Sequence, residues 1–262
     1  MTPLLASCLG VTPPLHAPGA YASSSFARRF HTLRRFLDHG PLLQAIEQIA
    51  PLRGRRVVEL GAGTGAISEG FARCAKDLHA LDRSPAMLVQ ARAHMQRLGL
   101  RNTRFLLADH RALPFPSGTF DVSVAAFALD SLLHDSSDTP WWEGVGMVTQ
   151  EMLRILVPGG TAFVIATPFG RPNLALHLIR ERGFSHRFLS CRWTFPSRRL
   201  ARAATRFFFG ERAWREYAPH WPKALATPVA LLWTTSSQAP AGAAPAPLRD
   251  HTRPAPSEPR PL

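Results

Sequence analysis

The chain of 262 residues has little cysteine and no long apolar run. Its three cysteines, Cys8, Cys74 and Cys191, are odd in number and far apart, which argues against a disulfide framework and against a zinc site. No segment approaches the ~20 consecutive apolar residues that cross a membrane, and the proline-interrupted N-terminus lacks the basic start of a secretory signal. We therefore expect a cytoplasmic protein without a metal site or a membrane span.

Lysine is nearly absent, and the net charge of +13 comes from arginine. Residues 54–170 carry eleven basic and eleven acidic residues, whereas residues 171–223 carry twelve basic and three acidic ones. Two interpretations stay open for this uneven distribution. The arginines form a solvated surface, or they attract an acidic substrate, a nucleic acid or a membrane surface.

Composition and periodicity divide the chain into a core with additions at both ends. The predicted segments are a disordered N-terminus (1–25), N-terminal helices (26–53) split at Gly40-Pro41, one α/β domain (54–235), and a disordered Pro/Ala-rich tail (236–262). Within the domain, residues 197–222 form an arginine-rich and aromatic helical insertion before the last strand. Strands alternate with helices in the rest of the domain, which predicts a parallel sheet with helices on both faces.

Seven strands and five helical segments follow from the pattern of apolar residues. The strands are expected at 57–60, 78–81, 105–108, 120–126, 161–167, 187–195 and 228–234. The helices of this domain are expected at 66–76, 84–98, 141–156, 173–182 and 197–217. Pro158-Gly159-Gly160 is interpreted as the stop of the helix before it.

The strongest motif is a glycine loop that follows the first strand directly, Gly61-Ala62-Gly63-Thr64-Gly65. A buried strand, a glycine loop and a helix bring backbone N–H groups close to a ligand, and the missing side chains let the ligand lie against the backbone. The same letters match the dinucleotide pattern, so an NAD-dependent enzyme stays open as an alternative.

Two aspartates follow the next two strands. Asp82 lies at the carboxyl end of the second strand, where a carboxylate can accept hydrogen bonds from both hydroxyls of a ribose. Asp109 lies at the end of the third strand, where an acceptor can bind the amino group of an adenine. The loop and both aspartates, in this order, predict a nucleoside-binding site at the carboxyl edge of the sheet.

The sequence resembles the class I S-adenosylmethionine-dependent methyltransferases, particularly the small-molecule group with a ubiquinone/menaquinone-methyltransferase type of core. The resemblance covers residues 54–168. The matching segments are Glu59-Leu60-Gly61-Ala62-Gly63-Thr64-Gly65, Leu81-Asp82, Ser84-Pro85-Ala86-Met87-Leu88, Ala108-Asp109, Leu113-Pro114-Phe115, Phe120-Asp121-Val122 and Leu153-Arg154-Ile155-Leu156-Val157-Pro158-Gly159-Gly160.

This resemblance implies a Rossmann-like, doubly wound and mostly parallel seven-stranded sheet with an antiparallel last strand. It implies S-adenosylmethionine as the cofactor, and a site made of Glu59, Gly61, Ala62, Gly63, Thr64, Gly65, Asp82, Arg83, Met87, Asp109, His110 and Phe127. The glycines would hold the amino-acid portion, and Glu59 would hold the loop or the methionine amino group. Asp109 and His110 would border the adenine, and Phe127 would flank the sulfonium.

Methyl transfer from a sulfonium is an in-line displacement that depends mainly on positioning, although an acceptor with an acidic proton also needs a base. Asp130 and His134, just after the fourth strand, are the candidate bases, and a solvated loop position is the alternative for each. No Asn/Asp-Pro-Pro-aromatic element and no cysteine follow that strand, which disfavours two common routes of base methylation. We therefore favour a small-molecule acceptor over a nucleic acid, and both over a non-catalytic protein that keeps the fold.

Residues 198–222 depart from a minimal core of this family. Their aromatic and arginine side chains could cover the pocket and bind an anionic or aromatic acceptor. An amphipathic helix that packs its aromatic residues on the sheet and leaves its arginines in water explains the pattern equally well. A helix on a membrane surface is a weaker alternative. The sequence gives no indication of the oligomeric state.

Overall fold

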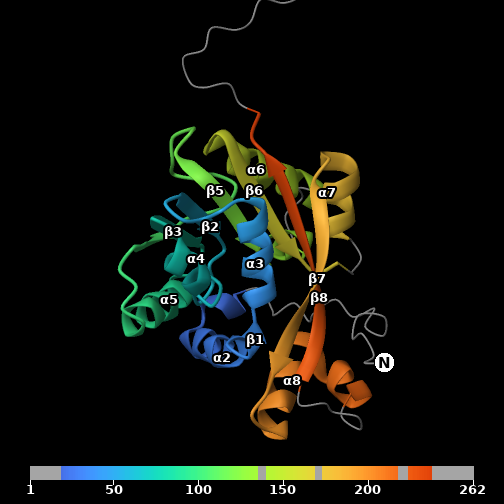
Figure 1. Ribbon diagram of the computed structural model, residues 1–262. Helices are drawn as coiled ribbons and strands as arrows, with labels where there is room; N and C mark the ends of the chain where they lie inside the picture. The colour runs from blue at the N-terminus through green and yellow to red at the C-terminus, as the bar shows by residue number, and fades with distance from the viewer. Residues whose placement is uncertain (1–18, 135–139, 169–172, 218–223, 238–262) are drawn as a thin grey trace, which may run out of the picture.

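The computed structural model describes residues 19–134, 140–168, 173–217 and 224–237, and Figure 1 shows their arrangement. The described helices are η1 (Ala20–Ala22), α2 (Ser24–Arg34), α3 (Gly40–Ile49), α4 (Ser68–Cys74), α5 (Pro85–Arg97), η2 (Leu129–His134), α6 (Trp141–Arg154), α7 (Leu174–Arg182) and α8 (Arg198–Tyr217). The described strands are β1 (Leu37–Asp38), β2 (Arg56–Leu60), β3 (Asp77–Asp82), β4 (Thr103–Leu107), β5 (Phe120–Ala126), β6 (Leu156–Ala166), β7 (Ser185–Thr194) and β8 (Ala224–Thr235).

These strands form one sheet in the order β1-β7-β8-β6-β5-β2-β3-β4. The pairs from β4 through β3, β2 and β5 to β6 are parallel, whereas β8 is antiparallel to β6 and to β7. This confirms the mostly parallel Rossmann-like sheet with an antiparallel last strand. The expected number of strands was one too few, because β1 has only two residues, opposite Arg192 and Trp193. Two residues are too short for an alternating pattern to be visible in the sequence.

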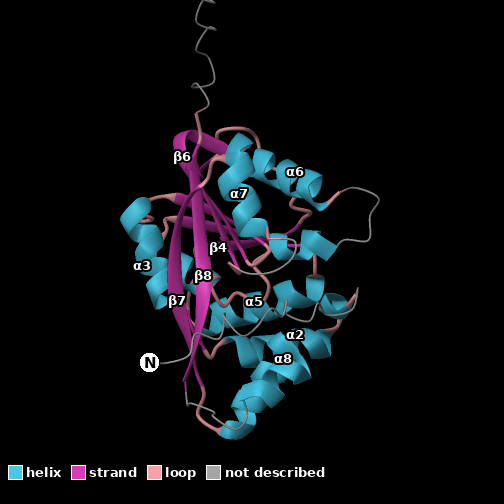
Figure 2. Cartoon of the chain, turned by 90° about the vertical axis from the view of Figure 1, so that its right-hand side faces the viewer, coloured by secondary structure: helices cyan, strands magenta, loops and turns pink. Residues whose placement is uncertain are grey.

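Helices cover both faces of the sheet, as predicted. Successive residues of the central strands point to opposite faces, so that Val57 and Val58 of β2 belong to different core clusters. One cluster packs the sheet against α2, α3, α4 and α8, and the other packs it against α6 and α7. Figure 2 shows α3 on one side of β7 and β8, with α6 and α7 on the other.

The β7–β8 hairpin extends beyond the carboxyl edge of the parallel strands. Residues 230–235 of β8 pair with β6, which ends at Ala166, whereas residues 224–229 pair with β7 alone. The free half of the hairpin carries α8 at its tip and brings α8 against α2 (Figure 1). The ligands of open α/β sheets bind at this carboxyl edge, so α2 and α8 lie where a substrate would approach.

Several predicted boundaries differ in the structure. Residues 19–25 belong to the segment expected to be disordered, yet they form η1 and the start of α2, whose first turn is capped by the Ser23 hydroxyl at 3.4 Å from Phe26 N. Pro158-Gly159-Gly160 lies within β6 instead of marking the end of α6, which already stops at Arg154. Residues 1–18 and 238–262, the rest of the predicted disordered ends, lie outside the described residues.

Candidate functional site

The glycine loop leaves β2 with a backbone that only glycine adopts easily. Gly61, Gly63 and Gly65 have φ values of 69°, 55° and 82°. A side chain at Gly61 would collide with Ala128, and one at Gly65 would crowd α5. A Cβ at Gly63, in contrast, would meet no atom within 4 Å. The loop is therefore packed against protein at its two ends and has open space over its middle glycine.

Asp82 fixes that middle glycine and the next helix at once. The Gly63 N–H donates to Asp82 Oδ2 at 2.8 Å, and the Ser84 N–H donates to Asp82 Oδ1 at 2.8 Å. The Ala62 N–H donates to the Leu81 carbonyl at 2.8 Å, which ties the loop to β3. Each carboxylate oxygen keeps a further lone pair, so Asp82 can also accept a hydrogen bond from a ligand beside Gly63.

Glu59 lies under the loop in the core. Its side chain is 1% exposed, and it accepts a hydrogen bond of 2.5 Å from the Ser68 hydroxyl, on the first residue of α4. Burial raises the pKa of the Glu59 carboxyl to about 7. Thr64 is also buried, and its hydroxyl has no hydrogen-bond partner among the described residues. The base of the loop thus holds an ionisable carboxyl and a hydroxyl that has no hydrogen-bond partner among the described residues. A polar ligand can form hydrogen bonds with both groups.

Asp109 and His110 follow β4, the strand next to β3, which ends at Asp82. Arg111 engages both oxygens of Asp109, with its Nε 3.0 Å from Oδ1 and its Nη2 2.8 Å from Oδ2. This pairing lowers the pKa of the Asp109 carboxyl to about 2. His110 places Cε1 3.2 Å from the position that a Cβ of Gly61 would occupy, and burial lowers the pKa of its imidazole. His110 therefore borders the loop directly, and the adenine contact of Asp109 stays a prediction.

Arg83 and Met87 lie on either side of the helix start that follows Asp82. Arg83 is exposed, whereas Met87 is buried in the first turn of α5, where its N–H donates to the Ser84 hydroxyl at 3.2 Å. Ser84 also donates its hydroxyl hydrogen to the Tyr21 carbonyl at 2.6 Å. This serine therefore links the cofactor-side helix to η1.

Phe127 occupies the turn after β5 and is the only described non-glycine residue with a positive φ, 54°. Its ring lies 4.8 Å from Cζ of Arg34, which comes from the end of α2. The Arg34 guanidinium also lies 5.6 Å from the ring of Trp193, and burial lowers its pKa to about 10. No carboxylate pairs with Arg34 among the described residues. A buried cation that lies over aromatic rings therefore borders the predicted position of the reacting methyl group.

Asp130 and His134, the candidate bases, lie in η2. Burial raises the pKa of the Asp130 carboxyl to about 7, which is the range of a general base at neutral pH. Burial raises the pKa of the Tyr21 phenol, and the charges of Asp82 and Asp130 also raise it, whereas Arg83 and Arg34 lower it. His134 ends η2, but its side chain lies outside what the structure describes.

Sequence reasoning missed Tyr21, Ser68 and Arg34. Tyr21 lies in a segment of low-complexity composition, and neither Ser68 nor Arg34 has a motif of its own. Ser68 could have been found, because a helix-start hydroxyl after a glycine loop is placed to reach the strand below. The closeness of Arg34 to Phe127 depends on tertiary packing alone.

Comparisons with known proteins agree with this geometry. Residues 57–160 match the profile of the family described as methyltransferase domain. The chain is 35% identical over 133 residues to the malonyl-[acyl-carrier protein] O-methyltransferase of Halorhodospira halophila, over 49% of this chain and 40% of that protein. It is 31% identical over 151 residues to the demethylmenaquinone methyltransferase of Thermus thermophilus, over 55% of this chain and 64% of that protein. It therefore spans about half the length of the curated relatives it matches.

Among solved structures, a SAM-dependent methyltransferase from Aquifex aeolicus has a TM-score of 0.52 at 15% identity, over 82% of this chain and 98% of that one. This likeness concerns the fold. The fold and the loop define an α/β domain of the methyltransferase type. With the family match, residues 57–160 form the core of a class I S-adenosylmethionine-dependent methyltransferase domain, a domain type whose cofactor is S-adenosylmethionine. No described helix is long and apolar enough to cross a membrane.

Proposed function

We propose that the whole protein transfers a methyl group from S-adenosylmethionine to a small-molecule acceptor. One observation carries this proposal: the Asp82 carboxylate holds the Gly63 N–H at 2.8 Å, and the space over Gly63 is open. A nucleoside ligand fits this arrangement, because it needs a carboxylate for its ribose beside a backbone that has no side chains. The wide spacing and odd number of the cysteines support a cytoplasmic location for this reaction.

The bound cofactor supplies an electrophilic methyl group on a sulfonium, so the residues of the chain mainly bind and orient. The glycine loop and Asp82 would hold the amino-acid and ribose portions. Glu59, whose carboxyl has a pKa of about 7, would in its ionised form balance the positive charge of the cofactor's ammonium group. His110 and Met87 would border the adenine, and Phe127 would present its ring to the sulfonium.

Asp130 is the best candidate to remove a proton from the acceptor. Its carboxyl lies just after β5, at the edge of the sheet that carries the site, and its pKa of about 7 lets it exist in both protonation states at neutral pH. Proton transfer by such a group typically contributes a factor of ~10²–10⁴ to the rate. His134 stays a second candidate from the sequence.

The surroundings of Phe127 favour an acceptor with anionic or aromatic character. Arg34 brings a positive charge beside that ring, and Trp193 Nε1 is a buried donor with no partner among the described residues. A carboxylate, phosphate or phenolate on the acceptor would satisfy both groups. The arginines of residues 171–223 support a nucleic-acid acceptor as the second candidate.

Calorimetric titration of the purified protein with S-adenosylmethionine, S-adenosylhomocysteine and NAD in parallel tests the cofactor. We expect micromolar binding of the first two and none of NAD. Transfer of tritiated methyl to a panel of phenolic acids, a reduced quinone and bulk tRNA then tests the acceptor. Preference for NAD, or transfer to tRNA alone, would contradict the proposal, and binding without transfer to any acceptor would favour a non-catalytic protein.

A further inference from the structure

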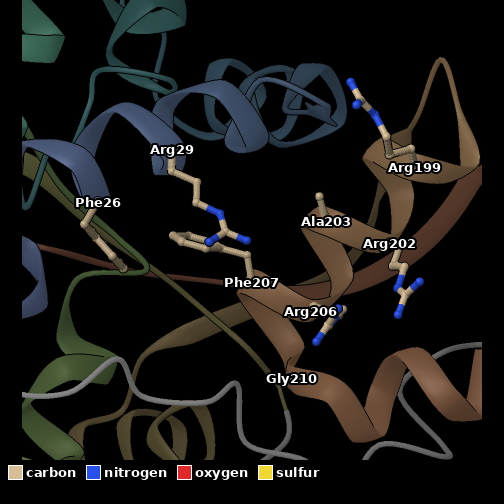
Figure 3. A pocket seen from close by; sticks show the side chains of 8 residues that line it. All are labelled: Phe26, Arg29, Arg199, Arg202, Ala203, Arg206, Phe207 and Gly210. Carbon is tan, nitrogen blue, oxygen red and sulfur yellow. The ribbon is translucent and has the colours of Figure 1, made fainter.

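A groove of about 830 Å³ separates α2 from α8, beyond the carboxyl edge of the sheet (Figure 3). The lining residues come from the two helices: Phe26, Arg29, Arg199, Arg202, Ala203, Arg206, Phe207 and Gly210. Arg199, Arg202 and Arg206 are three and four residues apart and therefore share one face of α8. The groove has an apolar floor and a rim of four positive charges.

Three of these arginines have no carboxylate partner in the part of the chain that the structure describes. Among the described residues, only Arg206 has an acidic partner, Glu211. Arg29 lies 5.1 Å over the ring of Phe207, and Arg202 lies 5.8 Å over the ring of Trp214. Stacking on rings orients a guanidinium but leaves its N–H donors available for an anion. The rim can therefore bind a negatively charged group without first breaking an ion pair.

Aromatic rings connect the groove with the cofactor side of the domain. Phe26, which lines the groove, lies 5.1 Å from Phe207 and 5.1 Å from Tyr21. The Tyr21 carbonyl accepts the hydrogen bond of Ser84, the residue that Asp82 also holds. A second row of rings runs from Phe207 through Phe208 to Trp193, next to Arg34. These contacts connect the lining of the groove with Tyr21 and with Arg34, whose Cζ lies 4.8 Å from the ring of Phe127.

We propose that this arginine-lined groove binds the anionic group of an amphipathic acceptor, a carboxylate or phosphate joined to an aromatic or alkyl body. This inference rests on the proposed function, because the molecule assigned to the groove is the methyl acceptor of that function. The net positive charge of this part of the chain favours an anionic occupant, since residues 171–223 contain twelve basic and three acidic residues. The phenyl rings of the floor favour an apolar body over a bare polyanion.

The test uses 1-naphthyl phosphate as the probe, with 1-naphthol and inorganic phosphate as its two halves. Isothermal titration of the full chain at low salt should show binding of the phosphate ester. Naphthol and inorganic phosphate should each bind about tenfold more weakly, because only the ester contacts both the arginine rim and the apolar floor. The double variant Arg199→Glu/Arg202→Glu should weaken the ester about tenfold or more. The matched variant Arg101→Glu/Arg104→Glu makes the same change of charge at exposed positions near β4, and should alter the affinity by less than about twofold.

S-adenosylhomocysteine titration of every variant separates the two proposals. Unchanged cofactor affinity in Arg199→Glu/Arg202→Glu, together with loss of the ester, supports the groove and shows that the variant is folded. If the ester binds but S-adenosylhomocysteine does not, the groove stands as an anion site and the methyltransferase proposal fails. Equal weakening by both double variants, competition between the ester and S-adenosylhomocysteine, or displacement of the ester by a short RNA at lower concentration would each overturn the groove proposal.

Discussion

The two ligand-facing regions of the molecule treat charge in opposite ways. Around the glycine loop, the strand-end carboxylates are bound by protein groups, Asp82 by two backbone N–H groups and Asp109 by Arg111. Around the α2–α8 groove, Arg29, Arg199 and Arg202 lie over rings or in solvent, with no carboxylate partner among the described residues. Under the two proposals above, the first region is preorganised for the cofactor, and the second keeps its charges available for the acceptor.

This comparison predicts that the cofactor region depends strongly on single residues. Asp82→Ala should raise the dissociation constant of S-adenosylhomocysteine by about 100-fold, because the carboxylate holds Gly63 and, under the proposal, would accept hydrogen bonds from the ribose. Calorimetric titration measures the change, and thermal unfolding shows that the variant is folded. Asp77→Ala, at the other end of β3, is the control and should leave the affinity unchanged. An unaltered affinity in Asp82→Ala would remove the ribose assignment.

A smaller effect is expected from filling the open space in the loop. Gly63→Ala should weaken cofactor binding about tenfold, because its methyl group occupies space that the ligand needs, in addition to ~1 kcal/mol of strain at φ 55°. Gly118→Ala is the matched control, since Gly118 also has a positive φ of 68° and open space around its Cβ position. Equal stability losses with unequal binding losses would confirm that the space over Gly63 belongs to the site. Equal binding losses would show that strain alone acts.

The geometry of the glycine loop could be predicted from sequence because most of its pattern is local. The strand and the glycines are adjacent in the chain, whereas Asp82 lies at the end of the next strand and is located by the order of strand, loop and helix. The side chain of Asp109 could not be placed in this way, since its rotamer depends on the neighbouring Arg111. A motif therefore locates a residue at the edge of the sheet without showing what it binds.

The groove region could be predicted only in part. Helical periodicity located α8 and its arginines, but the choice between a cap and a solvated helix depends on what lies opposite. That partner is α2, which starts within a segment expected to be disordered and which reaches α8 only because the β7–β8 hairpin extends past β6. No local pattern indicates how far a hairpin extends. The basic charge was visible, and its position beside Phe26 was not.

A weaker effect concerns Asp130, which tests the burial of its carboxyl. Burial raises its pKa from 3.8 to about 7, so the folded state holds a proton that the unfolded state has lost. The contribution of this carboxyl to the unfolding free energy is therefore complete below pH 4, and it is lost as the pH rises to 7. Asp130→Asn should exceed the wild type in unfolding free energy by on the order of 1 kcal/mol at pH 8, and the difference should shrink at pH 4. Denaturant titrations at both pH values measure it, and a difference independent of pH would contradict the burial.

The smallest effect concerns Glu59, whose pKa of about 7 is set by burial against the Ser68 hydrogen bond. If the ammonium group of the cofactor lies near this carboxyl, binding favours the ionised form, and a proton is released below pH 7. We expect release of about three quarters of a proton at pH 6.5, and affinity that falls about threefold between pH 7.5 and pH 6.5. Calorimetry in two buffers of different ionisation enthalpy measures the release, and Glu59→Gln should abolish it. Release that persists in Glu59→Gln would assign the proton to another group, such as His110, whose ring lies beside Gly61.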